Sequence, residues 1–103
     1  MQRYPVRTSH RGNLVPASLE TVCRRHFEEV TRDGETVVAR WGAIERLGAR
    51  ADGKTLGVEL TMNPKVDESV ARETIRRYNE FLEDATGFNS KERAKRLRKS
   101  AGE

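Results

Sequence analysis

Residues 44–62, which read IERLGARADGKTLGVELTM, decide the fold because they form two strand-like halves around a tight turn. The turn is Asp52-Gly53, which supplies the positive φ angles of a two-residue hairpin loop whose twist matches the strands that it joins. After the turn, apolar and polar residues alternate, as in a strand with one buried face. The inward set is Leu56, Val58, Leu60 and Met62. This stretch therefore predicts an antiparallel β-hairpin.

A second hairpin is predicted upstream. Asp33-Gly34 lies nineteen residues before Asp52-Gly53 and separates segments 29–32 and 35–39, which are rich in Val and Thr. Together with segments 44–51 and 54–62, they predict four sequential antiparallel strands. Residues 2–8 also have strand spacing, and Pro5, which lacks an amide donor, places that strand at an edge of the sheet.

A first helix is predicted between the edge strand and the hairpins. Asn13 is positioned as its N-cap, Pro16 is tolerated in its first turn, and it ends near His26 or Phe27. Apolar residues recur at steps of three and four, which indicates one buried face. They are Leu19, Val22, Cys23 and Phe27.

A longer helix follows the last strand. Asp67 is positioned as its N-cap, it runs to about Ala85, and Gly87 is positioned as its C-cap. Glu73 and Arg77 have the spacing of an ion pair on its surface. Its predicted apolar face consists of Val70, Thr74, Ile75, Tyr78, Phe81 or Leu82, and Ala85.

A basic helix over residues 88–103, capped by Ser90 or Asn89, is predicted to end the chain. Ala94, Leu97 and Ala101 form a narrow apolar strip that docks it, and its last residues fray. The predicted order is β-α-β-β-β-β-α-α. Strands gathered in the middle with helices outside them indicate an α+β two-layer sandwich, an antiparallel sheet with helices on one face. At 103 residues the chain holds one core, so residues 1–103 form a single domain.

Positive charge is concentrated at the two ends of the chain. Residues 12–87 carry eleven basic and fourteen acidic residues, a balance of −3, while the whole chain sums to +4. This distribution points to an anionic partner. The basic residues of the C-terminal helix are Lys91, Arg93, Lys95, Arg96, Arg98 and Lys99, and those of the N-terminus are Arg3, Arg7 and Arg11.

Three surfaces are candidate anion-binding sites. The C-terminal helix has the charge to follow a phosphate backbone, although a solvated helix explains the same charge. Arg46 and Arg50 project from the sheet away from the helices if the alternation holds, and Arg32 and Arg40 are expected to join them. The alternatives for that face are an ordinary polar surface or a dimer interface. The N-terminal arginines and His10 lie before a helix start, where free amides favour anions.

Catalytic, metal and cofactor sites are not predicted. Cys23 and His26 are three residues apart on one helix, but only His10 remains as a further soft ligand, and zinc needs three or four. The chain has no phosphate-binding loop, no G-x-G-x-x-G motif and no third group to orient a Cys-His nucleophile pair. One cysteine, no secretory leader and no run of 18 apolar residues indicate a cytoplasmic protein without a membrane span.

The segment Ala85-Thr86-Gly87-Phe88-Asn89-Ser90-Lys91-Glu92-Arg93, taken with the His10-Arg11-Gly12-Asn13 loop and the order of elements, resembles a small archaeal family of uncharacterised proteins. That resemblance implies a fold like that of the TATA-binding protein with an extra C-terminal helix. It further implies a positive surface that binds an anionic molecule, and no established activity.

Two functions remain open from the sequence. The first is non-enzymatic binding of a polyanion, DNA or RNA, through phosphate contacts from the C-terminal helix and the arginines of the sheet. The second is a structural or protein-interaction module that uses the open sheet face to form a homodimer or to bind an acidic partner. No cofactor is expected for either.

Overall fold

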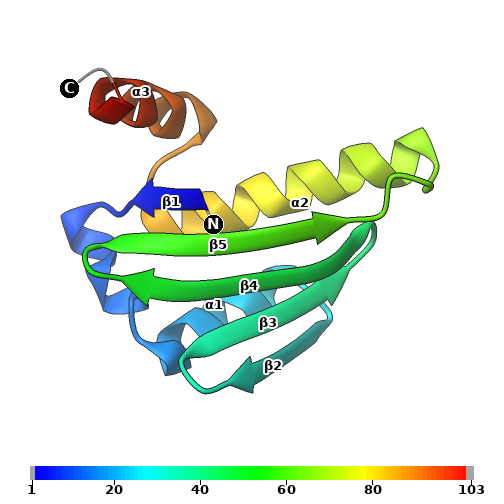
Figure 1. Cartoon of the computed structure of the whole chain (residues 1–103), viewed down its shortest axis with the longest axis horizontal. Helices are drawn as coiled ribbons and strands as arrows, with labels where there is room; N and C mark the ends of the chain where they lie inside the picture. Colours follow the sequence, from blue (N-terminus) through cyan, green and yellow to red (C-terminus); the bar gives the residue numbers. More distant parts are fainter. Residues whose placement is uncertain (1, 102–103) are drawn as a thin grey trace.

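A computed structural model describes the backbone of residues 2–101 and the side chains of residues 2–96. Its elements follow the predicted order, with one added 3₁₀ helix (Figure 1). They are β1 (Gln2–Pro5), the 3₁₀ helix η1 (Thr8–Asn13), α1 (Pro16–His26), β2 (Glu29–Asp33), β3 (Thr36–Trp41), β4 (Ile44–Asp52), β5 (Thr55–Met62), α2 (Glu68–Thr86) and α3 (Ser90–Ala101).

The five strands form one antiparallel sheet in the order β1-β5-β4-β3-β2. Helices α1 and α2 cover one face of this sheet, and α3 lies beyond the β1 edge (Figure 1). The opposite face, called the open face below, carries no helix formed by residues 2–101. This arrangement confirms the α+β architecture with helices on one side of an antiparallel sheet.

Both predicted hairpins are present, but their two-residue loops are Gly34-Glu35 and Gly53-Lys54 rather than Asp-Gly. The two aspartates are the last paired residues before each loop, and among the described residues only glycines have positive φ. Gly34 has φ +62° and Gly53 has φ +64°, the left-handed values that a two-residue turn requires. Asp33 pairs with Thr36 in the first hairpin, and Asp52 pairs with Thr55 in the second.

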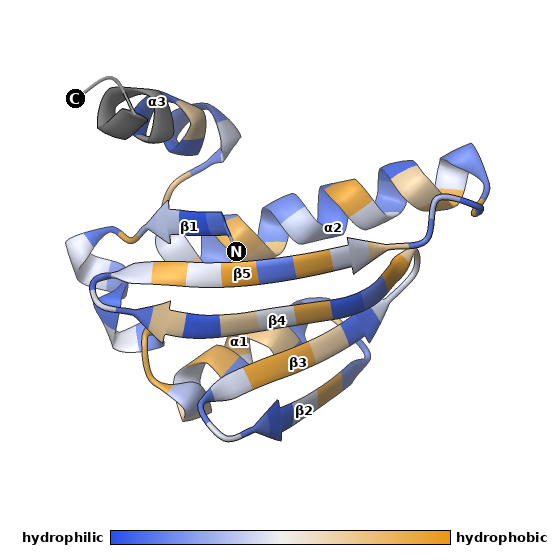
Figure 2. Cartoon of the chain, in the orientation of Figure 1, coloured by the Kyte–Doolittle hydropathy of each residue, from blue (hydrophilic) through white to orange (hydrophobic). Residues whose placement is uncertain are grey.

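The core lies between the sheet and the two longer helices. Apolar and polar residues alternate along β5, and β3 carries a continuous apolar block (Figure 2). The inward apolar residues of the sheet meet the predicted stripe of α1 and the second half of α2. The most deeply buried side chains include Leu19, Val22, Val37, Leu47, Leu56, Phe81 and Leu82. No helix within residues 2–101 is long and apolar enough to cross a membrane.

Asn13 does not cap α1, contrary to the sequence prediction. The N-cap position belongs to Val15, and the helix begins at Pro16. The Asn13 amide instead donates to the main-chain carbonyls of Asp84 and Ala85, at 3.4 and 3.1 Å. Because those carbonyls belong to the last turn of α2, the residue stabilises a helix end seventy positions away in the sequence.

The predicted apolar faces were too wide. Val70 and Ile75 of α2 are exposed rather than buried, and Leu60 is only partly covered on β5. Ala51, which pairs with the buried Leu56, is also exposed. The short β1 and the position of α2 leave these outer ends of the core layer without a covering element.

The expected ion pair between Glu73 and Arg77 does not form. Glu73 instead accepts hydrogen bonds from Arg76, which also lies near Glu80. The guanidinium of Arg77 lies over the ring of Trp41, 4.7 Å from its centroid. Stacking of a planar cation on an indole therefore draws Arg77 toward the β3–β4 turn.

Helix α3 begins with a capping box but does not dock through the predicted apolar strip. Asn89 Oδ1 accepts the main-chain N–H of Glu92, and the Glu92 carboxylate accepts that of Asn89. Ala94 is exposed, whereas Arg93 is only 4% exposed. The other two members of the strip, Leu97 and Ala101, lie outside the described side chains.

Candidate anion-binding surface

Two arginines border a shallow hollow on the open face. Arg46 and Arg50 flank Gly48 on β4, and period-two geometry places all three on the same side of the sheet. Thr36 of β3 and Glu59 of β5 complete the hollow, whose volume is about 200 Å³. Gly48 is buried beneath its neighbours, since a Cβ atom there would lie 3.5 Å from the Thr36 methyl group and 3.6 Å from a guanidinium nitrogen of Arg46.

A third arginine joins this surface across β5. Gly57 pairs with Arg50 on one side and with Arg3 of β1 on the other. All three residues point to the open face, and only the glycine lacks a side chain. Arg3 and Arg50 are therefore separated by two strand spacings, roughly 10 Å, with the buried Gly57 between them.

Gly48 and Gly57 are not sites of strand bends. Both lie in regular register, and the irregular pairing falls at residues 39–41 and 44–46 instead. The signal that could have identified them is their position in the alternation, because Arg46, Gly48 and Arg50 occupy one face at consecutive outward positions.

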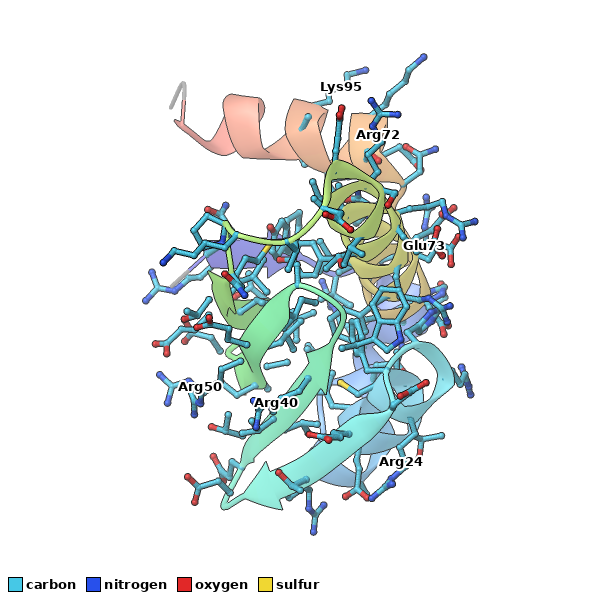
Figure 3. The ribbon with its side chains drawn as sticks, turned by 90° about the vertical axis from the view of Figure 1, so that its right-hand side faces the viewer. Arg24, Arg40, Arg50, Arg72, Glu73 and Lys95 are labelled. Carbon is cyan, nitrogen blue, oxygen red and sulfur yellow. The ribbon has the colours of Figure 1, made fainter. Side chains whose placement is uncertain are left out.

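The three open-face arginines differ in how they are neutralised. Arg3 forms an ion pair with Asp52, and Arg46 lies 3.8 Å from a carboxylate oxygen of Glu59. Arg50 forms no ion pair within residues 2–96, and its side chain projects away from the helices (Figure 3). Arg50 is thus the cation of this surface that is best placed to meet an external anion.

The two further strand arginines do not strengthen the cluster. Arg40 lies 4.0 Å from a carboxylate oxygen of Glu29. Arg32 lies 3.4 Å from Glu20 of α1, so it is on the helical side of the sheet and not on the open face.

Three of the predicted anion-binding arginines are instead gathered around Phe88. The guanidinium carbons of Arg7 and Arg96 lie 4.6 and 4.2 Å from the Phe88 ring centroid. Arg93 donates to the Phe88 carbonyl at 2.6 Å and to Asn79 Oδ1 at 3.0 Å. Burial lowers the pKa of Arg93. Arg93 is withdrawn from the candidate site because its buried guanidinium holds α3 to α2.

Arg7 joins the N-terminus to the start of α3. Besides its contact with Phe88, it donates to the carbonyl of Gly87 at 3.1 Å and to the Glu92 carboxylate at 3.1 Å. Arg11 is exposed on η1, and α1 begins five residues later, at Pro16. The N-terminal arginines are therefore divided among three environments and do not surround one helix terminus.

The described lysines of α3 do not border the hollow. Lys91 and Lys95 are exposed, and neither lines it. Figure 3 shows Lys95 at the outer end of the molecule, on α3, whereas Arg50 projects from the open face. Arg98 and Lys99 lie outside the described side chains. The structure thus separates Lys95 of α3 from Arg50 of the sheet.

The potential nucleophile and metal residues are engaged in the fold. Burial, with a smaller contribution from Glu20, raises the pKa of Cys23 to about 12, so the thiol stays protonated near neutral pH. His26 Nε2 lies 2.9 Å from Asp84 Oδ2, and His10 Nδ1 lies 2.9 Å from Ser9 Oγ. Among the described residues, no three His, Cys, Asp or Glu side chains are grouped to hold a metal ion.

Comparison with known proteins identifies relatives of this architecture. The solution structure of hypothetical protein TA0095 from Thermoplasma acidophilum, determined by NMR, is similar, with a TM-score of 0.71 and 24% identity over 94% of this chain and 97% of that one. At that identity the likeness shows the fold alone. No curated protein sequence matches the chain. A family model described as "Domain of unknown function (DUF5611)" matches residues 1–99, and the chain belongs to that family.

Proposed function

We propose that this protein is a non-enzymatic binder of a polyanion, DNA or RNA, and that the open face is its contact surface. The observation that carries the proposal is the placement of Arg50. It lacks an ion pair within the described residues, borders the hollow around Gly48, and is aligned through Gly57 with Arg3. A phosphate group entering the hollow would meet Arg50 first.

Arg46 and Arg3 are each paired with a carboxylate, so an anion would bind them by displacing that carboxylate. Exposed ion pairs contribute only about 0–1 kcal/mol each. A phosphate diester can therefore displace Glu59 from Arg46 or Asp52 from Arg3 at small cost, and Glu59 disfavours full occupation by a lone small anion. A polyanion that contacts several arginines at once gains the entropy of counterion release at each contact.

The open face favours phosphate contacts over reading of bases. The side chain of Tyr4 points to the helical side of the sheet, since its hydroxyl oxygen lies 3.3 Å from that of Tyr78 on α2. The ring of Trp41 is covered by the guanidinium of Arg77. Among the described residues, the open-face positions of the paired strands hold glycine, threonine, valine, proline and charged side chains, without an aromatic platform. Stacking and wedge insertion both need such side chains, so binding without strong sequence preference is proposed.

The fold resemblance enters this proposal only as support. A TATA-binding-protein-like arrangement, which the resemblance to the archaeal family implies, fits the observed order of elements and the uncovered sheet face. A cytoplasmic location is proposed with it, because a single cysteine fits a reducing compartment.

A second copy of this chain is the alternative occupant of the open face. The observation in its favour is that two outward positions of neighbouring strands, Gly48 opposite Glu59 and Gly57 opposite Arg50, carry no side chain. Its Arg46–Glu59 and Arg3–Asp52 pairs could exchange partners across a two-fold axis.

Anisotropy titrations with labelled single-stranded and duplex oligonucleotides, repeated at rising salt, test the proposal. Saturable binding at low salt that weakens linearly on a log–log plot is the expected result. Absence of binding at low salt would refute polyanion recognition. Sedimentation of the protein over a range of concentrations separates the alternative, since a dimer that occludes the open face predicts a mass twice that of the chain.

A further inference from the structure

The second half of β5 is an uncovered sheet edge. β1 pairs only with residues 55–58 of β5, so the edge over residues 59–62 has no neighbouring strand within the described residues. Figure 1 shows β1 ending partway along β5, while α2 runs behind the uncovered part. We call residues 59–62 the β5 open edge.

The hydrogen-bonding groups of this edge can be assigned from the register. Asp52 and Thr55 close the two-residue turn, so Thr55 and alternate residues after it bond to β4. The main-chain N–H of Asn63 continues this series, because it donates to the Ala43 carbonyl at 2.8 Å. The N–H and C=O groups of Leu60 and Met62 therefore point outward, where no described residue meets them.

A groove of mixed polarity runs beside those groups, with a volume of about 470 Å³. Tyr4, Val58, Leu60 and Tyr78 line its apolar part, and Gln2, Glu59 and Thr61 line its polar part. Leu60 is 37% exposed and Ile75 is 50% exposed, two of the four large apolar side chains that the described surface leaves in solvent. Ile75 precedes Tyr78 by three residues, so both lie on the same side of α2.

The other edge of the sheet is protected, which sets the β5 open edge apart. Arg24 donates to the outward carbonyl of Val30 on β2, at 3.3 Å. Three of the five residues of β2 are charged, namely Glu29, Arg32 and Asp33. Charged side chains on an edge strand disfavour its pairing with a strand of another chain. The β5 open edge instead offers Leu60, Thr61 and Met62, with a single charge at Glu59.

We propose that the β5 open edge binds an extended segment of another polypeptide, which adds to the sheet antiparallel to β5 in line with β1. The outward groups of Leu60 and Met62 require main-chain donors and acceptors at strand spacing, which an extended peptide supplies. Its inward side chains are apolar, since they lie beside Leu60 and Tyr78 in the apolar part of the groove.

A second copy of the chain does not fit this edge. Two β5 strands related by a two-fold axis would bring both α2 helices behind the same few strands, because α2 runs behind the open edge (Figure 1). Helices need about 8–10 Å between their axes, whereas adjacent strands are about 4.8 Å apart. A single peptide strand carries no helix and avoids this overlap.

The proposal is tested with a capped peptide that has Val and Leu at alternate positions, Thr between them and Lys at both ends. Titrated into isotope-labelled protein, it is expected to shift the amide NMR signals of Leu60 and Met62 saturably. Peptide N-methylated at the apolar residues is expected to lose binding about tenfold or more, while peptide N-methylated at the threonines retains it, since only the former loses the donors that face β5.

Protein variants supply the matched control. Ile75→Glu is expected to weaken binding about tenfold or more, whereas Val15→Glu, at an equally exposed apolar position elsewhere, leaves it unchanged. Absence of saturable shifts at millimolar peptide, equal binding of both methylated peptides, or shifts confined to β2 would overturn the proposal. So would concentration-dependent shifts of Leu60 and Met62 without peptide, which would assign the edge to a second copy.

Discussion

Arg93 and Asn79 join the C-terminal helix to α2 through a 3.0 Å hydrogen bond between a guanidinium nitrogen and the amide oxygen. The same guanidinium donates to the carbonyl of Phe88, at 2.6 Å. Arg93 therefore acts as the docking residue of α3 despite its place in a run of surface cations. The described cations of α3 therefore fall into two groups: Arg93 is buried and structural, whereas Lys91, Lys95 and Arg96 are exposed.

Replacing Arg93 tests this division. Arg93→Met leaves the Phe88 carbonyl and the Asn79 amide without their donors, and we expect it to lower the free energy of unfolding by about 2–4 kcal/mol. Lys95→Met, which removes an exposed cation from the same helix, is expected to change it by less than about 0.5 kcal/mol. Urea denaturation measures both. Equal effects of the two changes would contradict the docking role.

The turn between β3 and β4 depends on a glycine for two separate reasons. Gly42 has φ +55°, and a Cβ atom there would lie 2.5 Å from Thr74 Oγ1, which accepts the main-chain N–H of Ala43. Gly42→Ala is therefore expected to cost roughly 1–2 kcal/mol for the left-handed backbone and roughly 1–3 kcal/mol more for the clash.

Gly34→Ala is the matched control for that prediction. Gly34 has φ +62° and an added Cβ would meet nothing within 4 Å, so only the backbone cost applies. Thermal or urea unfolding of the two variants gives the difference. If Gly34→Ala destabilises the protein as much as Gly42→Ala, the close approach to Thr74 is not significant.

Cys23 is predicted to be inert in the folded protein. Burial raises the pKa of Cys23 from 9.0 to about 12, so the folded state keeps its proton where the unfolded chain releases it. Stability from this group is complete below pH 9 and falls as the pH rises toward 12. A thiol-reactive chromophore at pH 8 is expected to label the protein only in denaturant. Rapid labelling of the native protein would show that the thiol is accessible.

The hairpins and the end of α2 were predictable because their chemistry is local. Gly34 and Gly53 supply the positive φ of the two turns, and Gly87 ends α2 with φ +80° as a C-cap does. The errors arise where a side chain bonds to a distant element. Asn13 reaches the end of α2, Arg77 reaches Trp41, and neither partner is visible in the spacing of neighbouring residues.

The candidate site was predictable in part for the same reason. Strand alternation placed Arg46 and Arg50 on the open face, but the alignment of Arg3 with Arg50 depends on β1 pairing with β5, which are fifty residues apart. Burial of Arg93 depends on Asn79 of α2, so charge counting could not separate it from its exposed neighbours.

The measurement that tests polyanion binding by the open face most directly compares two variants of equal charge. Arg46→Gln with Arg50→Gln removes two cations from the open face, and Lys91→Gln with Lys95→Gln removes two from α3. In salt-dependent anisotropy titrations with duplex DNA, the first pair is expected to weaken binding and reduce the log–log salt slope by about two, since each phosphate contact contributes about 0.9. The second pair should change the slope little. A slope that drops only with the α3 pair would contradict the assignment of binding to the open face.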